Sequence, residues 1–114
     1  MMAVKQAHNE CEEKTSPLGK IQEIVDKWLK EIGGGYWPPL SMLANLVEEV
    51  GELAKVINAL EGPKRNEDIK KEDVASELGD VFFSLICIAN YYDINLEECI
   101  KRTIEKYNAR KVGG

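Results

Sequence analysis

Apolar residues recur at three- and four-residue steps through four segments of this 114-residue chain. That spacing places apolar side chains along one face of a helix, whereas a half-buried strand would need them at every second residue. No segment alternates apolar and polar residues over a useful length. The pattern therefore predicts an all-α chain.

The predicted helices cover about 17–32, 40–60, 69–92 and 96–111. Ser16 and Pro17 are typical of a helix start, because serine caps free amides and proline at the first helical position gives up no hydrogen bond. Asp68 is the predicted cap of the third helix. Asn95, followed by Glu98 three residues later, has the form of a capping box for the fourth.

The architecture we expect is a four-helix bundle completed by oligomerisation, because four short helices with broad apolar stripes supply little core alone. Residues 1–15 show no steady periodicity and are interpreted as a flexible arm, which leaves 16–112 as a single domain. A symmetric homodimer is the minimum expected assembly, and a homotetramer is an alternative.

Composition excludes several classes of protein. The net charge is −5 and the basic residues are mixed with acids, so no footprint for a nucleic-acid polymer is present. No uninterrupted apolar run approaches the roughly 20 residues that a membrane span needs. The polar first residues lack the form of a secretory signal, and a cytoplasmic location is expected. Cys11, Cys87 and Cys99 lack metal-site spacing and are expected to be free thiols.

Two acidic pairs sit inside the apolar runs of the second and third helices. Glu49 and Glu52 are three residues apart on one helix, and Glu77 and Asp80 repeat that spacing on the next. In each pair one acid lies at the margin of the apolar stripe and the other just outside it. If the two helices pack antiparallel, as a short connection favours, all four carboxylates converge.

Four converging carboxylates repel one another and call for protons or a cation. Mg²⁺ prefers such hard oxygen ligands and also bridges carboxylates to phosphate oxygens. Any one of these acids alone would be read as a solvated helix face, but two matched pairs are harder to explain as solubility. Gly51 and Gly79 weaken their helix interiors, which suggests close helix packing or ligand approach.

The order Glu48-Glu49-x-x-Glu52 followed by Glu77-x-x-Asp80 resembles the MazG-like family of all-α nucleoside triphosphate pyrophosphohydrolases. The resemblance runs from about Leu18 to Arg110, and the paired motif is far more specific than either half.

The resemblance implies hydrolysis of a nucleoside or deoxynucleoside triphosphate to the monophosphate and pyrophosphate, with a role in nucleotide-pool house-cleaning as one setting. It also implies Mg²⁺, for which Mn²⁺ could substitute. The implied metal ligands are Glu49, Glu52, Glu77 and Asp80, and the implied catalytic residues are Glu48 and Glu49, with Glu48 as an outer group or the base that prepares water. A metal neutralises charge on the triphosphate and positions the attacking water.

Substrate contacts are expected from three further residues. Lys106 and Asn108, on the last helix, resemble the phosphate-contacting segment of related proteins, although a basic helix end that stabilises its own C-terminus is an equal reading. Trp37 could stack on a base, and packing into the core is the favoured alternative. His8, alone in the arm, is expected to be an ordinary surface residue.

Two other functions remain open from the sequence. A related pyrophosphohydrolase of histidine biosynthesis shares the helical plan, which makes phosphoribosyl-ATP an alternative substrate. A non-catalytic helical dimerisation module, whose acids only solvate the surface or bind a stray cation, is the alternative outside enzymes.

Overall fold

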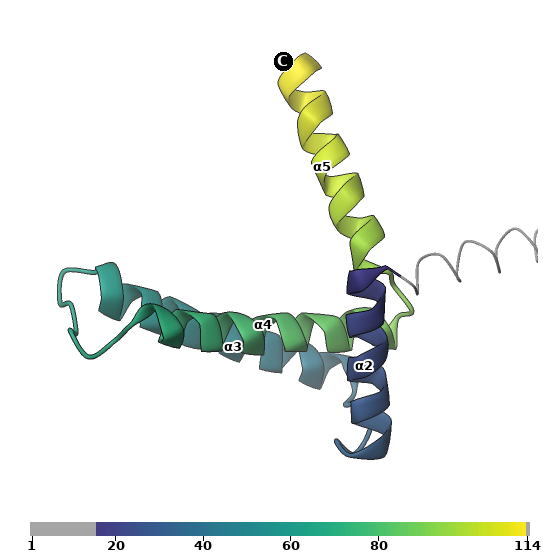
Figure 1. The fold of residues 1–114 in the computed structure, drawn as a ribbon, viewed down its shortest axis with the longest axis horizontal. Helices are drawn as coiled ribbons and strands as arrows, with labels where there is room; N and C mark the ends of the chain where they lie inside the picture. Colours follow the sequence, from purple (N-terminus) through teal and green to yellow (C-terminus); the bar gives the residue numbers. More distant parts are fainter. Residues whose placement is uncertain (1–15, 114) are drawn as a thin grey trace, which may run out of the picture. The chain divides into compact units, whose positions relative to one another are not determined.

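The computed structural model describes residues 16–113. Its elements are α2 (Pro17–Glu31), α3 (Pro39–Glu61), α4 (Lys71–Tyr91) and α5 (Leu96–Gly113) (Figure 1). No strand occurs in this part of the chain, and the predicted helix ends differ from the observed ones by two residues at most. The all-α, four-helix prediction is confirmed. The predicted arm, with His8 and Cys11, lies outside the described residues.

The helices form two compact units. One contains α2, α5 and the end of α4 from Ala89 onward, and the other is Tyr36–Ile88, which holds α3 and most of α4. The prediction of a single domain over 16–112 stays a prediction.

In the first unit, a capping serine and a glycine run define α2. The Ser16 hydroxyl accepts a hydrogen bond from the Gly19 backbone N–H at 3.0 Å, as predicted. The helix ends at the three glycines that follow Ile32, where Gly34 and Gly35 have φ angles of 85° and 91°. These left-handed conformations suit glycine because it lacks a Cβ.

Gln22 ties α2 to the turn between α4 and α5. Its amide nitrogen donates to Asn90 Oδ1 at 3.0 Å and to the Ile94 carbonyl at 2.9 Å, while its amide oxygen accepts from the Leu96 backbone N–H at 2.9 Å. Asn90 in turn donates to the Gln22 carbonyl at 2.9 Å. Gln22 is buried beside a small core, and its full pairing avoids the free-energy penalty of an unsatisfied buried amide.

The start of α5 follows the predicted cap. Asn95 Oδ1 accepts from the Glu98 backbone N–H at 2.8 Å. The Glu98 carboxylate pairs with Arg102 at 2.8 Å, one turn along the helix. The Asn95 half of the predicted capping box is therefore present. The Glu98 side chain forms an ion pair with Arg102.

The second unit is a helical hairpin. Pro38 and Pro39 begin α3, Gly62 ends it, and α4 runs back alongside it in the opposite direction (Figure 1). Met42 of α3 and Ile86 of α4 are buried. The antiparallel pairing that the sequence predicted for these two helices is present.

The start of α4 differs from the prediction. The helix begins at Lys71, too far from Asp68 for that side chain to be the cap. Asp73 instead accepts from the Lys70 backbone N–H at 2.8 Å, and Asn66 accepts from the Asp68 N–H at 3.0 Å. Asp68 was the wrong choice because a local turn uses its backbone and moves the helix start two residues on. Asp73 thereby stabilises the start of α4.

Apolar faces of both hairpin helices remain exposed. The exposed side chains recur at three- and four-residue steps on each helix, as the apolar stripes do. They are Leu43, Val47, Val50 and Ile57 on α3, and Leu78, Phe82 and Leu85 on α4. We call these two stripes the open apolar face.

By length and composition alone, α4 is one helix that could cross a membrane. Core helices of proteins outside membranes reach the same length and mean hydropathy. Glu77 and Asp80 lie in the middle of this helix, and ionisable side chains are costly inside a bilayer. The expectation of no membrane segment stays a prediction.

Candidate metal and active site

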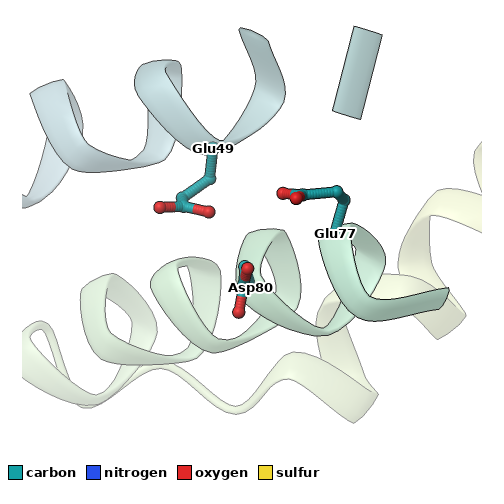
Figure 2. Close-up of side chains that lie close together, drawn as sticks. All are labelled: Glu49, Glu77 and Asp80. Atoms are coloured by element: carbon teal, nitrogen blue, oxygen red, sulfur yellow. The ribbon is translucent and has the colours of Figure 1, made fainter. Parts of the chain in front are cut away.

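Three acidic side chains of the hairpin converge. Glu49 extends from α3 toward α4, and Glu77 and Asp80 extend from successive turns of α4 (Figure 2). One carboxylate oxygen from each residue lies within 4.8 Å of the others. Glu49 and Glu77 are half-buried, whereas Asp80 is exposed. We call these three residues the carboxylate triad.

The triad is a consequence of helix geometry. Glu77 and Asp80 are three residues apart and so share one face of α4, and the antiparallel pairing brings Glu49 opposite them. Three of the four side chains that the sequence predicted as metal ligands therefore meet within one unit of the fold.

The environment of Glu49 disfavours the charged form of its side chain. Its pKa is raised above the ordinary value, first because partial burial disfavours the charged form. Repulsion from neighbouring carboxylates raises it further, in the order Asp80, Glu77, Glu52 and Glu48. A divalent cation would relieve both effects, because it replaces lost hydration and offsets the negative charge.

Glu48 and Glu52 stand outside the triad. Both are exposed on α3, and neither belongs to the group of oxygens within 4.8 Å. They are nevertheless near enough to raise the pKa of Glu49. Their predicted roles, Glu52 as a ligand and Glu48 as an outer group or base, stay predictions.

Gly51 and Gly79 flank the site without close packing. A Cβ added to either glycine would meet no atom within 4 Å in the described chain, apart from its own helix and neighbours. Close packing between helices of this chain is therefore the wrong explanation for them. Approach by a ligand or a second molecule remains compatible with both.

A hydrogen bond one turn from the triad was missed from the sequence. The Asn45 side-chain amide donates to the Ser84 hydroxyl at 2.8 Å, joining α3 to α4. Ser84 is only 3% exposed, so its hydroxyl lies inside the hairpin and not on its surface. Asn45 precedes Glu49 by four residues and Ser84 follows Asp80 by four, which is the sequence pattern that could have identified the pair.

The three predicted substrate contacts lie outside the triad. Trp37 is 57% exposed at the start of the hairpin unit, so packing into the core of this chain does not account for it. Lys106 and Asn108 are exposed on α5, in the other unit. The Lys106 ammonium lies 5.4 Å from the centre of the Tyr107 ring. Contact between any of them and a nucleotide stays a prediction.

Comparison with known protein families gives a match to the MazG nucleotide pyrophosphohydrolase domain over residues 38–112. The matched stretch contains the whole carboxylate triad, Glu48, Glu52, and the Asn45 and Ser84 pair. It also covers two of the three residues expected to contact substrate, Lys106 and Asn108.

Two individual proteins are similar to this chain over most of its length. The uncharacterised protein YpjD of Bacillus subtilis strain 168 is 42% identical over 91 residues, which cover 79% of this chain and 82% of YpjD. The uncharacterised protein YvdC of the same strain is 31% identical over 97 residues, covering 75% of this chain and 92% of YvdC.

Solved structures have the same fold. The crystal structure of YpjD from Bacillus subtilis, suggested to be a pyrophosphatase, superposes with a TM-score of 0.75 at 39% identity and covers 82% of this chain and 96% of that one. A Bacillus-conserved MazG protein described as a nucleotide pyrophosphohydrolase gives a TM-score of 0.72 at 35% identity, covering 85% and 95%.

Proposed function

We propose, from the premise that this chain belongs to the MazG nucleotide pyrophosphohydrolase family, that it hydrolyses nucleoside triphosphates to the monophosphate and pyrophosphate. The observation that carries this proposal is the carboxylate triad, whose oxygens lie within 4.8 Å of one another. A triphosphate is itself highly anionic, so three acids are a suitable binding site for it only through a cation.

Mg²⁺ fits the donor set. All three groups offer hard carboxylate oxygens, and the arrangement leaves one side exposed at Asp80, where water or phosphate oxygens could complete the coordination. The raised pKa of Glu49 is the second supporting observation, because it marks charge repulsion that a cation would relieve. Mn²⁺ should substitute, since it accepts the same oxygen ligands.

The acidic residues of the site would have separate roles in metal binding and proton transfer. Glu49, Glu77 and Asp80 would hold the ion, which when bound neutralises phosphate charge and lowers the pKa of water. Glu52 would add a ligand once its side chain turns toward the triad. Glu48 would accept a proton from the attacking water, for which a carboxylate within reach is a suitable base.

Substrate selection would come from outside the triad. Lys106 and Asn108 offer a cation and an amide for phosphate oxygens, and the exposed ring of Trp37 offers a stacking surface for a base. We propose that modified as well as standard triphosphates are accepted, which would suit a house-cleaning role in the nucleotide pool.

A second copy of this chain is the proposed cover for the open apolar face. Exposed Val47 and Phe82 belong to stripes on neighbouring helices, and apolar faces of this kind favour association. A homodimer would bury such a face symmetrically, and a homotetramer would repeat the contact.

Product identification tests the reaction. The full chain is incubated with Mg²⁺ and a panel of standard triphosphates, modified triphosphates and phosphoribosyl-ATP, and products are resolved by ³¹P NMR. We expect the monophosphate and pyrophosphate to form together, in equal amounts, from nucleoside triphosphates. Asp80→Asn should lower the rate about 100-fold or more.

Three results would contradict parts of the proposal. Orthophosphate as the first product would overturn the assigned bond cleavage. Turnover of phosphoribosyl-ATP alone would favour the alternative substrate. Absence of any turnover, with Mg²⁺ leaving the melting temperature unchanged, would favour the non-catalytic module.

A further inference from the structure

The contact between Asn45 and Ser84 is a directional link between the two helices that carry the triad. The amide nitrogen of Asn45 lies 2.8 Å from the Ser84 hydroxyl oxygen, and Ser84 is almost fully buried. We propose that this hydrogen bond is a positioning contact that holds α3 and α4 in the register at which the triad can grip a cation. The inference rests on the proposed function, since it concerns the same site.

The hydrogen bond between Asn45 and Ser84 and the approach of Glu49 to Asp80 require the same alignment of α3 with α4. Asn45 lies four residues before Glu49 on α3, and Ser84 lies four residues after Asp80 on α4, while the helices run in opposite directions. Four residues correspond to about one helical turn, or roughly 6 Å along the axis. The alignment that pairs Asn45 with Ser84 is therefore the alignment that places Glu49 opposite Asp80. A slide of either helix breaks both.

The hydrogen bond differs from the apolar contacts of the hairpin in being directional. Leu46, Leu53 and Val81, which are half-buried apolar residues of this unit, pack without directional preference. A hydrogen bond, by contrast, weakens once its atoms separate by a few tenths of an ångström or lose alignment. The bond therefore adds a directional preference for this register to apolar contacts that have none.

Charge repulsion makes this restraint matter most before the cation binds. One carboxylate oxygen each from Glu77 and Asp80 lies within 4.8 Å of one from Glu49 across the helix contact, a separation at which like charges repel one another. Without a cation, the repulsion favours separation of α3 from α4. The bond one turn away opposes that separation, so the triad is arranged in advance for its ion.

Ser84→Ala tests the proposal, because it removes the hydroxyl and retains a small helix-forming residue. Ser84→Thr restores a hydroxyl at the same position. Ser76→Ala makes the identical change at an exposed site on the same helix and serves as the matched control. Mn²⁺ is the probe, and its dissociation constant is measured on the full chain by electron paramagnetic resonance, beside kcat, KM and the melting temperature.

We expect Ser84→Ala to weaken Mn²⁺ binding about tenfold, the scale seen when groups that orient metal ligands are removed. KM for the nucleotide at saturating Mn²⁺ should change little. Ser84→Thr should recover most of the affinity, and Ser76→Ala should match the wild type. Asn45→Ala should weaken binding as much as Ser84→Ala, and the double variant should lose no more than either alone.

Mn²⁺ affinity at the wild-type level in Ser84→Ala would overturn the proposal, as would additive losses in the double variant. If Ser84→Ala does not fold, Asn45→Ala decides in the same way, since it breaks the same bond from a half-buried position. A wild type that binds Mn²⁺ but cleaves no nucleotide would refute the proposed function, while the affinity comparison would still decide on positioning. A wild type that binds no Mn²⁺ would refute both.

Discussion

At the scale of single residues, Glu49 meets opposing demands. Its side chain is half-buried between two helices, and four other carboxylates repel its charge. Both effects favour the protonated acid and raise the pKa of Glu49. A bound cation favours the ionised form instead, so protons and metal compete for this residue.

Glu49→Gln should therefore stabilise the metal-free protein and weaken its response to metal. The amide keeps the size of the side chain and removes the repelled charge. In the wild type, a cation at about ten times its dissociation constant should add about 1.4 kcal/mol, a shift of several degrees in melting temperature. The variant should show little of this shift in a thermal melt with and without Mg²⁺.

The sign of the pH dependence follows from the raised pKa. Below the ordinary value of 4.5, Glu49 is protonated in the folded and unfolded chains alike, so wild type and variant should melt alike without metal. As the pH rises through 4.5 and then through the higher folded pKa, the unfolded chain loses its proton first and the wild type loses stability. The melting temperature of Glu49→Gln minus that of the wild type should grow over this range, and a gap that shrinks would contradict the account.

At the scale of elements, helix positions were predictable because their causes are local. Ser16 and Asn95 cap their helices with their own side chains, as read from neighbouring residues alone. The prediction that Asp68 caps α4 was wrong because the turn at Asn66 depends on backbone geometry, which a cap motif does not encode. The link between Asn45 and Ser84 joins residues 39 positions apart, so it required the helix pairing as well as the pattern.

The glycines of α3 and α4 illustrate the same limit. The sequence alone shows that a glycine lowers the stability of a helix. Why a glycine occupies that position depends on the atoms that surround it in the folded protein. Apart from the chain neighbours and the backbone of the same helix, no atom of the described chain lies within 4 Å of a Cβ added at Gly51 or Gly79, so packing between α3 and α4 does not require them. The open space beside Gly51 and Gly79 is compatible with the approach of a ligand or of a second molecule.

Gly51→Ala and Gly79→Ala should each raise the free energy of unfolding of the metal-free chain by about 0.5–1 kcal/mol, because alanine restricts the unfolded backbone and favours the helix. Urea denaturation followed by circular dichroism measures the change. Gly62→Ala is the contrasting control and should destabilise, since its new Cβ would collide with the Asn58 backbone carbonyl oxygen. Destabilisation by Gly79→Ala would instead indicate that another molecule packs against that position.

At the scale of the whole molecule, the exposed apolar side chains outweigh the buried ones. Met42 and Ile86 are buried in the hairpin unit, whereas Val47 and Phe82 are 63% and 41% exposed. The sequence showed the apolar stripe of each helix. It did not show which side of each stripe contacts the neighbouring helix, because a broad stripe is compatible with several helix pairings.

Val47→Lys should shift the protein toward the monomer, because it places a charge within the open apolar face. Sedimentation velocity over a range of concentrations measures the assembly, and the wild type should sediment as a homodimer or homotetramer. Val112→Lys is the matched control at a position that is 89% exposed near the end of α5, and it should leave the assembly unchanged. A wild type that stays monomeric at about 100 μM would contradict the proposed second copy.

The measurement that bears most directly on the carboxylate triad is a Mn²⁺ binding titration of the wild type beside Glu49→Gln, Glu77→Gln and Asp80→Asn. Glu67→Gln, an exposed acid in the loop before α4, serves as the control for lost negative charge. Each triad variant should weaken Mn²⁺ binding by about tenfold or more, while Glu67→Gln binds as the wild type does. Equal affinity in the wild type and all three triad variants would contradict the assignment of these side chains as the metal site.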